Sequence, residues 1–142
     1  MPEIERVGVV GAGTMGNGIA HVCARAGLRV VLYDVQRPFL DRGLATIERN
    51  LAREVAKGKL TEQQASEARA RITPALDPAA LGGCSLAIEA ATEKFAIKAE
   101  IFRELDRVLP AEAVLASNTS SISITKLAAE TRRPEQVIGM HF

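Results

Sequence analysis

The sequence has few of the features that mark secreted, membrane-bound or nucleic-acid-binding proteins. Its 142 residues include only two cysteines, Cys23 and Cys84, which form no C-x-x-C or zinc-like spacing and lie among apolar neighbours. We therefore expect buried, reduced thiols and no metal site. The net charge of +1 gives no electrostatic attraction to nucleic acid or anionic lipid. No apolar run approaches the ~20 residues of a membrane span, so we expect a cytoplasmic protein without nucleic-acid or membrane partners.

A composition of 47% hydrophobic and 25% charged residues predicts one globular domain over residues 1–142. Strand and helix patterns alternate along it, which is typical of a parallel sheet covered on both faces. The expected strands are Val7–Val10, Arg29–Tyr33, Ile72–Ala75, Ser85–Glu89, Val114–Ala116 and Val137–Met140. The expected helices are Thr14–Ala26, Arg37–Lys57, Thr61–Ala70, Lys94–Leu109 and Ile124–Glu130. The second and third helices exceed what a crossover needs, so we expect them to form a projecting hairpin.

Glycines recur where the first strand meets the first helix, in the pattern Gly11-x-Gly13-x-x-Gly16. Gly11 permits a tight turn, and Gly13 lets the backbone approach a pyrophosphate at the helix N-terminus. Gly16 and Gly18 are expected to let the helix lie close to the sheet. The pattern in this context predicts a Rossmann-type, doubly wound α/β domain that binds a dinucleotide. The predicted cofactor loop also includes Ala12, Thr14 and Met15.

Asp34 ends the second predicted strand, where an acid would accept hydrogen bonds from both ribose hydroxyls of an adenosine. A 2′-phosphate would meet like charge there, which favours NAD over NADP. Arg37, close by, could still accommodate a 2′-phosphate. The alternative is that the glycines only form a turn and that Asp34 caps the next helix.

The last third of the chain, Ala116–Phe142, reads ASNTSSISITKLAAETRRPEQVIGMHF. Its SNTSS and GMHF turns resemble the short-chain 3-hydroxyacyl-CoA dehydrogenase and 3-hydroxybutyryl-CoA dehydrogenase family. The resemblance extends to GAGTMGNGIA, to Asp34 and to Ile88–Lys98, and so over essentially the whole chain. It implies NAD-dependent interconversion of (S)-3-hydroxyacyl-CoA and 3-oxoacyl-CoA, in fatty acid or butanoate metabolism.

The resemblance also implies roles for single residues. His141 would be the general base, a role that suits an imidazole near neutral pH. Ser120 would position the substrate oxygen and contact both cofactor and substrate, and Asn118 would lie beside the nicotinamide. The plainer alternatives are a histidine that caps a strand end and polar residues that hold a turn. A glutamate and an asparagine that complete the family's site would lie beyond Phe142.

Further positions match with less specificity. Glu93 and Lys98 correspond to family positions near the cofactor, beside Ala90 and Ala91, where the backbone would pass close to the dinucleotide. A solvated acid and base on a helix surface are the alternative. On the hairpin, Asn50 and Lys57 match positions that contact CoA, although the family often has serine in place of Asn50. His21 is expected on the surface of the first helix.

The resemblance places a helical domain and a homodimer interface after Phe142, outside this chain. The 142 residues alone are then expected to bind NAD weakly and to turn over negligibly. Two other functions stay open: a dehydrogenase of a free hydroxy acid or sugar acid, and a dinucleotide-binding module without catalysis.

Overall fold

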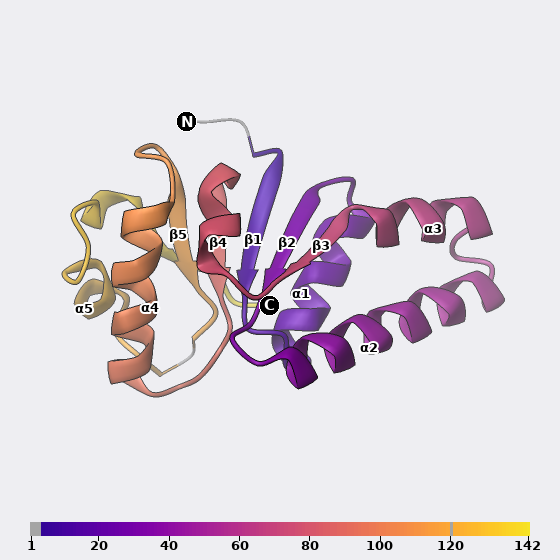
Figure 1. Cartoon of the computed structure of the whole chain (residues 1–142), viewed down its shortest axis with the longest axis horizontal. Helices are drawn as coiled ribbons and strands as arrows, with labels where there is room; N and C mark the ends of the chain where they lie inside the picture. The colour runs from indigo at the N-terminus through magenta and orange to yellow at the C-terminus, as the bar shows by residue number, and fades with distance from the viewer. Residues whose placement is uncertain (1–3, 120) are drawn as a thin grey trace.

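A computed structural model describes residues 4–119 and 121–142 and shows a single parallel sheet. Its six strands run in the order β3-β2-β1-β4-β5-β6, so all their carboxyl ends meet at one edge (Figure 1). The strands are β1 (Arg6–Val10), β2 (Arg29–Tyr33), β3 (Ile72–Ala75), β4 (Leu86–Glu89), β5 (Val114–Ser117) and β6 (Val137–Gly139). This order confirms the doubly wound arrangement. Successive strands are added to one side of β1 up to β3 and to its other side from β4 onward, and such folds bind ligands at this switch point between β1 and β4.

Helices cover both faces of the sheet. They are α1 (Thr14–Arg25), α2 (Arg37–Ala56), α3 (Glu62–Ala70), α4 (Phe95–Val108) and α5 (Ile124–Ala128), with short 3-10 helices η1 (Pro78–Gly83) and η2 (Pro134–Gln136). One apolar cluster joins the sheet to α1, α2 and α3, and a second joins it to α4, α5 and η1. Ile47 of α2 and Phe102 of α4 are fully buried in these two layers.

Every strand and helix expected from the sequence is present, with ends displaced by a few residues. The two 3-10 helices were not predicted, because each is only one or two turns long, opens with proline and has no apolar repeat. η1 replaces a full crossover helix between β3 and β4. β6 ends at Gly139, so Met140, His141 and Phe142 follow the strand and lie outside it.

The predicted hairpin is formed by α2 and α3, which extend side by side away from the sheet (Figure 1). The expected capping box begins α3: the Thr61 hydroxyl accepts from the Gln64 backbone N–H at 3.1 Å, and the Gln64 side chain accepts from the Thr61 N–H at 2.9 Å. This pair satisfies two backbone donors that would otherwise lack partners at the helix start.

Arg133 joins the connection between α5 and β6 to α4 through hydrogen bonds with Asp106. Its Nε donates to Asp106 Oδ1 at 2.7 Å, and its Nη2 donates to the Asp106 carbonyl at 2.9 Å. Asp106 Oδ2 accepts from the Arg132 N–H at 2.9 Å. Burial by itself raises the pKa of Asp106, but the Arg132 N–H and the Arg133 guanidinium outweigh burial and hold that pKa below its usual range.

The Asp106 carboxylate should therefore make the stability of the fold depend on pH. Folding lowers the pKa of this carboxyl group. Its contribution to the free energy of unfolding is therefore complete above the pKa of ~3.9 that it has in the unfolded chain, and is lost as pH falls through the pKa of the folded state. We expect Asp106→Asn to lower the free energy of unfolding by about 2 kcal/mol at pH 7. Urea unfolding at pH 7 and pH 3 checks this, and an equal difference at both pH values would contradict it.

Both cysteines are free and buried, as expected, and burial raises the pKa of the Cys84 thiol to about 11. Within the part of the chain that the structure describes, no helix has the length and apolar character needed to traverse a bilayer. Across residues 4–119 and 121–142, no group of three or more His, Cys, Asp or Glu side chains is arranged to hold a metal ion.

Candidate functional site

The glycine-rich loop lies at the carboxyl edge of the sheet, between β1 and α1. Gly11 has φ +105°, a conformation that favours glycine, and its N–H donates to the Tyr33 carbonyl at 2.8 Å. A Cβ on Gly16 would lie 1.6 Å from the Gly11 oxygen, so only glycine allows α1 to begin this close to the loop. A Cβ on Gly13 would meet nothing within 4 Å, which leaves its backbone open to a ligand.

The structure corrects the role predicted for Gly18. Gly18 is exposed, and a Cβ there would also meet nothing within 4 Å, so this glycine does not bring α1 close to the sheet. A glycine that the sequence did not single out has the packing role instead. A Cβ on Gly43 of α2 would lie 2.7 Å from the Ala12 oxygen, so α2 packs directly against the loop.

Asp34 joins the end of β2 to the glycine loop. Its Oδ2 accepts from the Ala12 N–H and its Oδ1 from the Gln36 N–H, each at 2.9 Å. The carboxylate is therefore held at the edge of the loop, as the dinucleotide pattern predicts. Arg37 lies 3.7 Å from Asp41 one turn further along α2, with 67% of its side chain exposed.

Two clefts flank the loop and share one residue, Ala91. The first, of about 340 Å³, is lined by Gly11, Asp34, Val35, Ala91, Ile97 and Ile101, among others. The second, of about 410 Å³, is lined by Met15, Ala90, Ala91, Glu93, Asn118 and His141, together with Thr92 and Phe142. The two clefts thus adjoin at Ala91, and together they mark a path from Asp34, past the loop, to the last residues of the chain.

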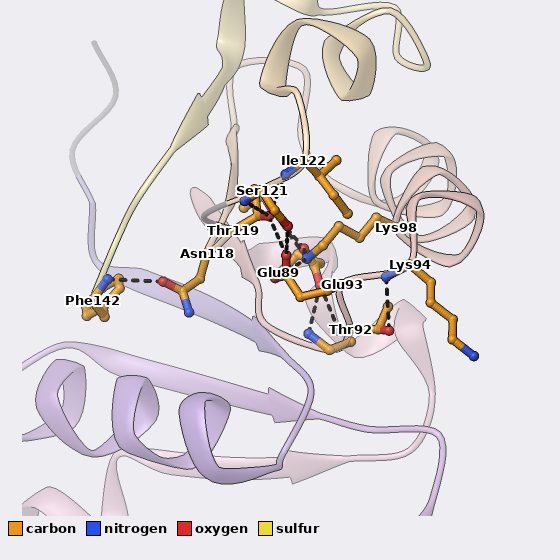
Figure 2. A network of polar contacts seen from close by, with 12 residues as sticks. Glu89, Thr92, Glu93, Lys94, Lys98, Asn118, Thr119, Ser121, Ile122 and Phe142 are labelled. Carbon is orange, nitrogen blue, oxygen red and sulfur yellow. Dashed lines mark hydrogen bonds and ion pairs between the residues drawn. The ribbon is translucent and has the colours of Figure 1, made fainter.

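His141 and Asn118 meet in the second cleft, although they come from different strands. Asn118 follows β5, and its Oδ1 accepts from the Phe142 N–H at 3.0 Å, next to His141 (Figure 2). The Met140 N–H donates to the Ser117 carbonyl at 3.0 Å, so the segment with His141 continues beside β5. His141 is exposed to the cleft. Ser120, the other predicted catalytic residue, lies outside the described residues.

Glu93 holds the SNTSS turn from the β4–α4 loop. Its Oε2 accepts from the Ser121 hydroxyl at 2.7 Å and from the Thr119 hydroxyl at 2.9 Å. The hydroxyls of Ser121 and Thr119 lower the pKa of Glu93; slight burial opposes them, and Lys98 lowers it further. The acid is therefore ionised at neutral pH and ties together the two segments that line the second cleft.

Lys98 is not the solvated base that the plainer interpretation allowed. Its side chain is fully buried, and Nζ forms an ion pair with Glu89 and donates to Ser117 Oγ at 3.4 Å. Neither Glu89 nor Ser117 was predicted as a site residue, because Glu89 was assigned only to its strand and Ser117 only to the SNTSS turn. A charged residue within an apolar strand, LAIE, is the signal that could have identified Glu89.

The hairpin residues Asn50 and Lys57 lie apart from the two clefts. Asn50 is partly buried on α2, and its Oδ1 accepts from Arg53 Nη1 at 3.5 Å, while Lys57 is exposed where α2 ends. His21 is less exposed than predicted: it packs between α1 and α2, and its Nε2 lies 2.5 Å from Glu54 Oε1.

A sequence model of the 3-hydroxyacyl-CoA dehydrogenase NAD-binding domain matches residues 6–142. The chain belongs to this family. NAD is therefore the cofactor of this NAD-binding domain, as Asp34 predicted.

Two curated relatives and one solved structure carry related names. The chain is 55% identical, over 98% of its length, to a 3-hydroxybutyryl-CoA dehydrogenase of Bradyrhizobium diazoefficiens, and covers 47% of that protein. It is 43% identical, over its full length, to a 3-hydroxyadipyl-CoA dehydrogenase of Escherichia coli, and covers 30% of it. It matches 50% of the crystal structure of an (S)-3-hydroxybutyryl-CoA dehydrogenase from Ralstonia eutropha, at 47% identity and a TM-score of 0.96 over 99% of this chain. The chain thus spans half or less of the length of these proteins.

The residues of this NAD-binding domain fit the cofactor. No acidic residue occupies the first turn of α1 and no side chain caps its start, so the partial positive charge of the helix faces the open backbone at Gly13. Asp34 supplies acceptors at one end of the path, and the two clefts extend from the loop in both directions.

We expect Asp34→Asn to weaken NAD binding about tenfold, because a charge-assisted hydrogen bond contributes ~1.5–3 kcal/mol. The same change should narrow the preference for NAD over NADP, since the repulsion of a 2′-phosphate is removed. Calorimetric titration of both cofactors into the 142-residue chain measures these effects. Glu112→Gln, which removes an exposed acid before β5, is the matched control and should leave both affinities unchanged.

Proposed function

We propose that this domain serves an enzyme that interconverts (S)-3-hydroxyacyl-CoA and 3-oxoacyl-CoA, in fatty acid or butanoate metabolism. The observation that carries the proposal is the shared cleft of His141, Asn118 and Met15, next to the glycine loop. It puts a proton acceptor at the end of the path opposite Asp34, where a nicotinamide would lie. NAD, if bound along this path, would supply the redox chemistry as the acceptor of a hydride from the substrate carbon.

The residues of the chain would then divide the work by position. Gly11, Gly13 and the start of α1 hold the pyrophosphate, Asp34 the adenosine ribose, and Asn118 the nicotinamide half. His141 takes the proton from the substrate 3-hydroxyl, since imidazole accepts protons near neutral pH. Ser120 is proposed to orient the same oxygen by a hydrogen bond. Ala90, Ala91, Glu93 and Lys98 form or support the wall along which the cofactor lies.

The two curated relatives are more than twice as long as this chain, and we propose a second half that closes over the substrate and forms a homodimer interface. We propose that Asn50 and Lys57 on the hairpin contact the CoA nucleotide, and that the protein works in the cytoplasm. The isolated 142 residues are then expected to bind NAD weakly and to turn over negligibly. Robust steady-state turnover by this chain alone would contradict that division.

The test compares NADH formation by the full-length protein from (S)-3-hydroxybutyryl-CoA and from free 3-hydroxybutyrate at equal concentration. We expect the thioester to react and the free acid to be a poor substrate, because the CoA contacts are then absent. Preference for the free acid would favour the dehydrogenase of a free hydroxy acid. Absence of turnover with both compounds, despite NAD binding, would favour a binding module without catalysis.

A further inference from the structure

A buried carboxylate lies beneath the second cleft and contacts three separate segments. Glu89 Oε2 accepts from the Ala91 N–H at 2.7 Å and, at 3.4 Å, from the Thr92 N–H. Glu89 Oε1 accepts from Ser117 Oγ at 2.7 Å and pairs with the Lys98 ammonium. The β4–α4 loop, the end of β5 and α4 therefore meet on one side chain (Figure 2).

The charges in this cluster are fully removed from solvent. Glu89, Lys98 and Ser117 each have 0% exposure. A buried ion pair of this kind is weak evidence for stability, because desolvation offsets its attraction and apolar residues of similar size often serve as well. What the pair supplies and apolar side chains cannot is fixed geometry, because its hydrogen bonds specify where the groups that meet on it must lie.

The segments that Glu89 holds are those that border the cofactor path. Ala91 is the residue that both clefts share, and its Cα would lie 2.9 Å from a Cβ on Gly11. A shift of Ala91 would thus disturb the glycine loop. Ser117 directly precedes Asn118, and its carbonyl accepts from Met140, one residue before His141.

We propose that Glu89 is a positioning residue for the NAD site and that Lys98 acts through it. The buried pair fixes the Ala91–Thr92 backbone against the glycine loop and sets the spacing between that loop and the strand end that carries Asn118. The inference rests on the proposed path of NAD along the two clefts. Lys98 is then a member of the support beneath the cofactor, with its Nζ turned toward Glu89.

The test uses the double variant E89M/K98M in the 142-residue chain. It removes both charges together, keeps similar side-chain volume and leaves no buried ion unpaired. We expect it to remain folded, to bind NAD at least tenfold more weakly by calorimetry, and to show faster amide exchange at Ala91 and Thr92. Parental NAD affinity or parental exchange at these amides would overturn the proposal.

S117A provides a second, milder test, because it removes the hydrogen bonds that join Glu89 and Lys98 to β5 and changes no charge. We expect a severalfold loss of NAD affinity, and parental affinity in S117A would equally overturn the proposal. The matched control is D106N, which weakens a buried ion pair whose two residues line neither cleft, and which should lower stability without changing NAD affinity. D34N tests the proposed path of NAD separately. If D34N binds NAD with parental affinity, the proposed path is wrong, regardless of how the Glu89 variants behave.

Discussion

We expect His141→Gln to lower kcat for oxidation of 3-hydroxybutyryl-CoA by about 10²- to 10⁴-fold in the full-length protein. Glutamine keeps a polar side chain of similar reach but accepts no proton near neutral pH. The backbone around His141 is fixed by the Met140–Ser117 and Phe142–Asn118 hydrogen bonds, which do not involve the imidazole. NAD affinity should therefore stay near the parental value while the chemical step slows.

His21→Gln is the matched control, because the chain contains only these two histidines. His21 pairs with Glu54 between α1 and α2, away from the clefts, so this variant should keep the parental kcat. Steady-state kinetics at saturating NAD and thioester measure both variants. Full activity in His141→Gln would remove the imidazole from the mechanism and leave the proposed proton transfer without a base.

The second large effect concerns Gly16. We expect Gly16→Ala to lower the free energy of unfolding by about 3 kcal/mol or more, and to abolish measurable NAD binding. The added Cβ would overlap the Gly11 carbonyl oxygen, a backbone atom that cannot rotate away. α1 would have to withdraw from the loop, which would also move its N-terminus from the pyrophosphate position.

We expect Gly18→Ala, two residues further along the same helix, to change the free energy of unfolding in the opposite direction. Its Cβ would meet open space, so the higher helix propensity of alanine should stabilise the fold by ~0.5–1 kcal/mol. Urea unfolding and NAD titration of both variants provide the comparison. Parental stability in Gly16→Ala would show that α1 can move away from the loop without a loss of folding free energy, and would contradict the requirement for glycine at this position.

Much of the fold could be predicted because local patterns and the three-dimensional arrangement agree. The glycine loop, Asp34 and the alternation of strands and helices each depend on residues close in sequence. The role of Gly18 was wrong because helix packing depends on which face a residue occupies, and Gly18 is on the exposed one. Gly43 was missed because its contact, Ala12, is distant in the sequence.

The cluster around Glu89 was also not predicted, because it too depends on contacts between residues that are distant in the sequence. Glu89, Lys98 and Ser117 come from β4, α4 and β5, and no spacing relates them. Lys98 could be placed near the cofactor by resemblance, but its burial and its partner follow only from the way α4 packs over the sheet. His141 and Asn118 were easier to pair, because the carboxyl ends of neighbouring parallel strands meet at one edge.

The sharing of Ala91 between the two clefts has an evolutionary consequence. Every residue named along the path from Asp34 to His141 belongs to this one continuous segment of chain. The residues proposed to hold NAD would therefore stay together if this segment were joined to a different second half. A segment of this kind can be inherited as a module, with new chemistry acquired through what is joined to it.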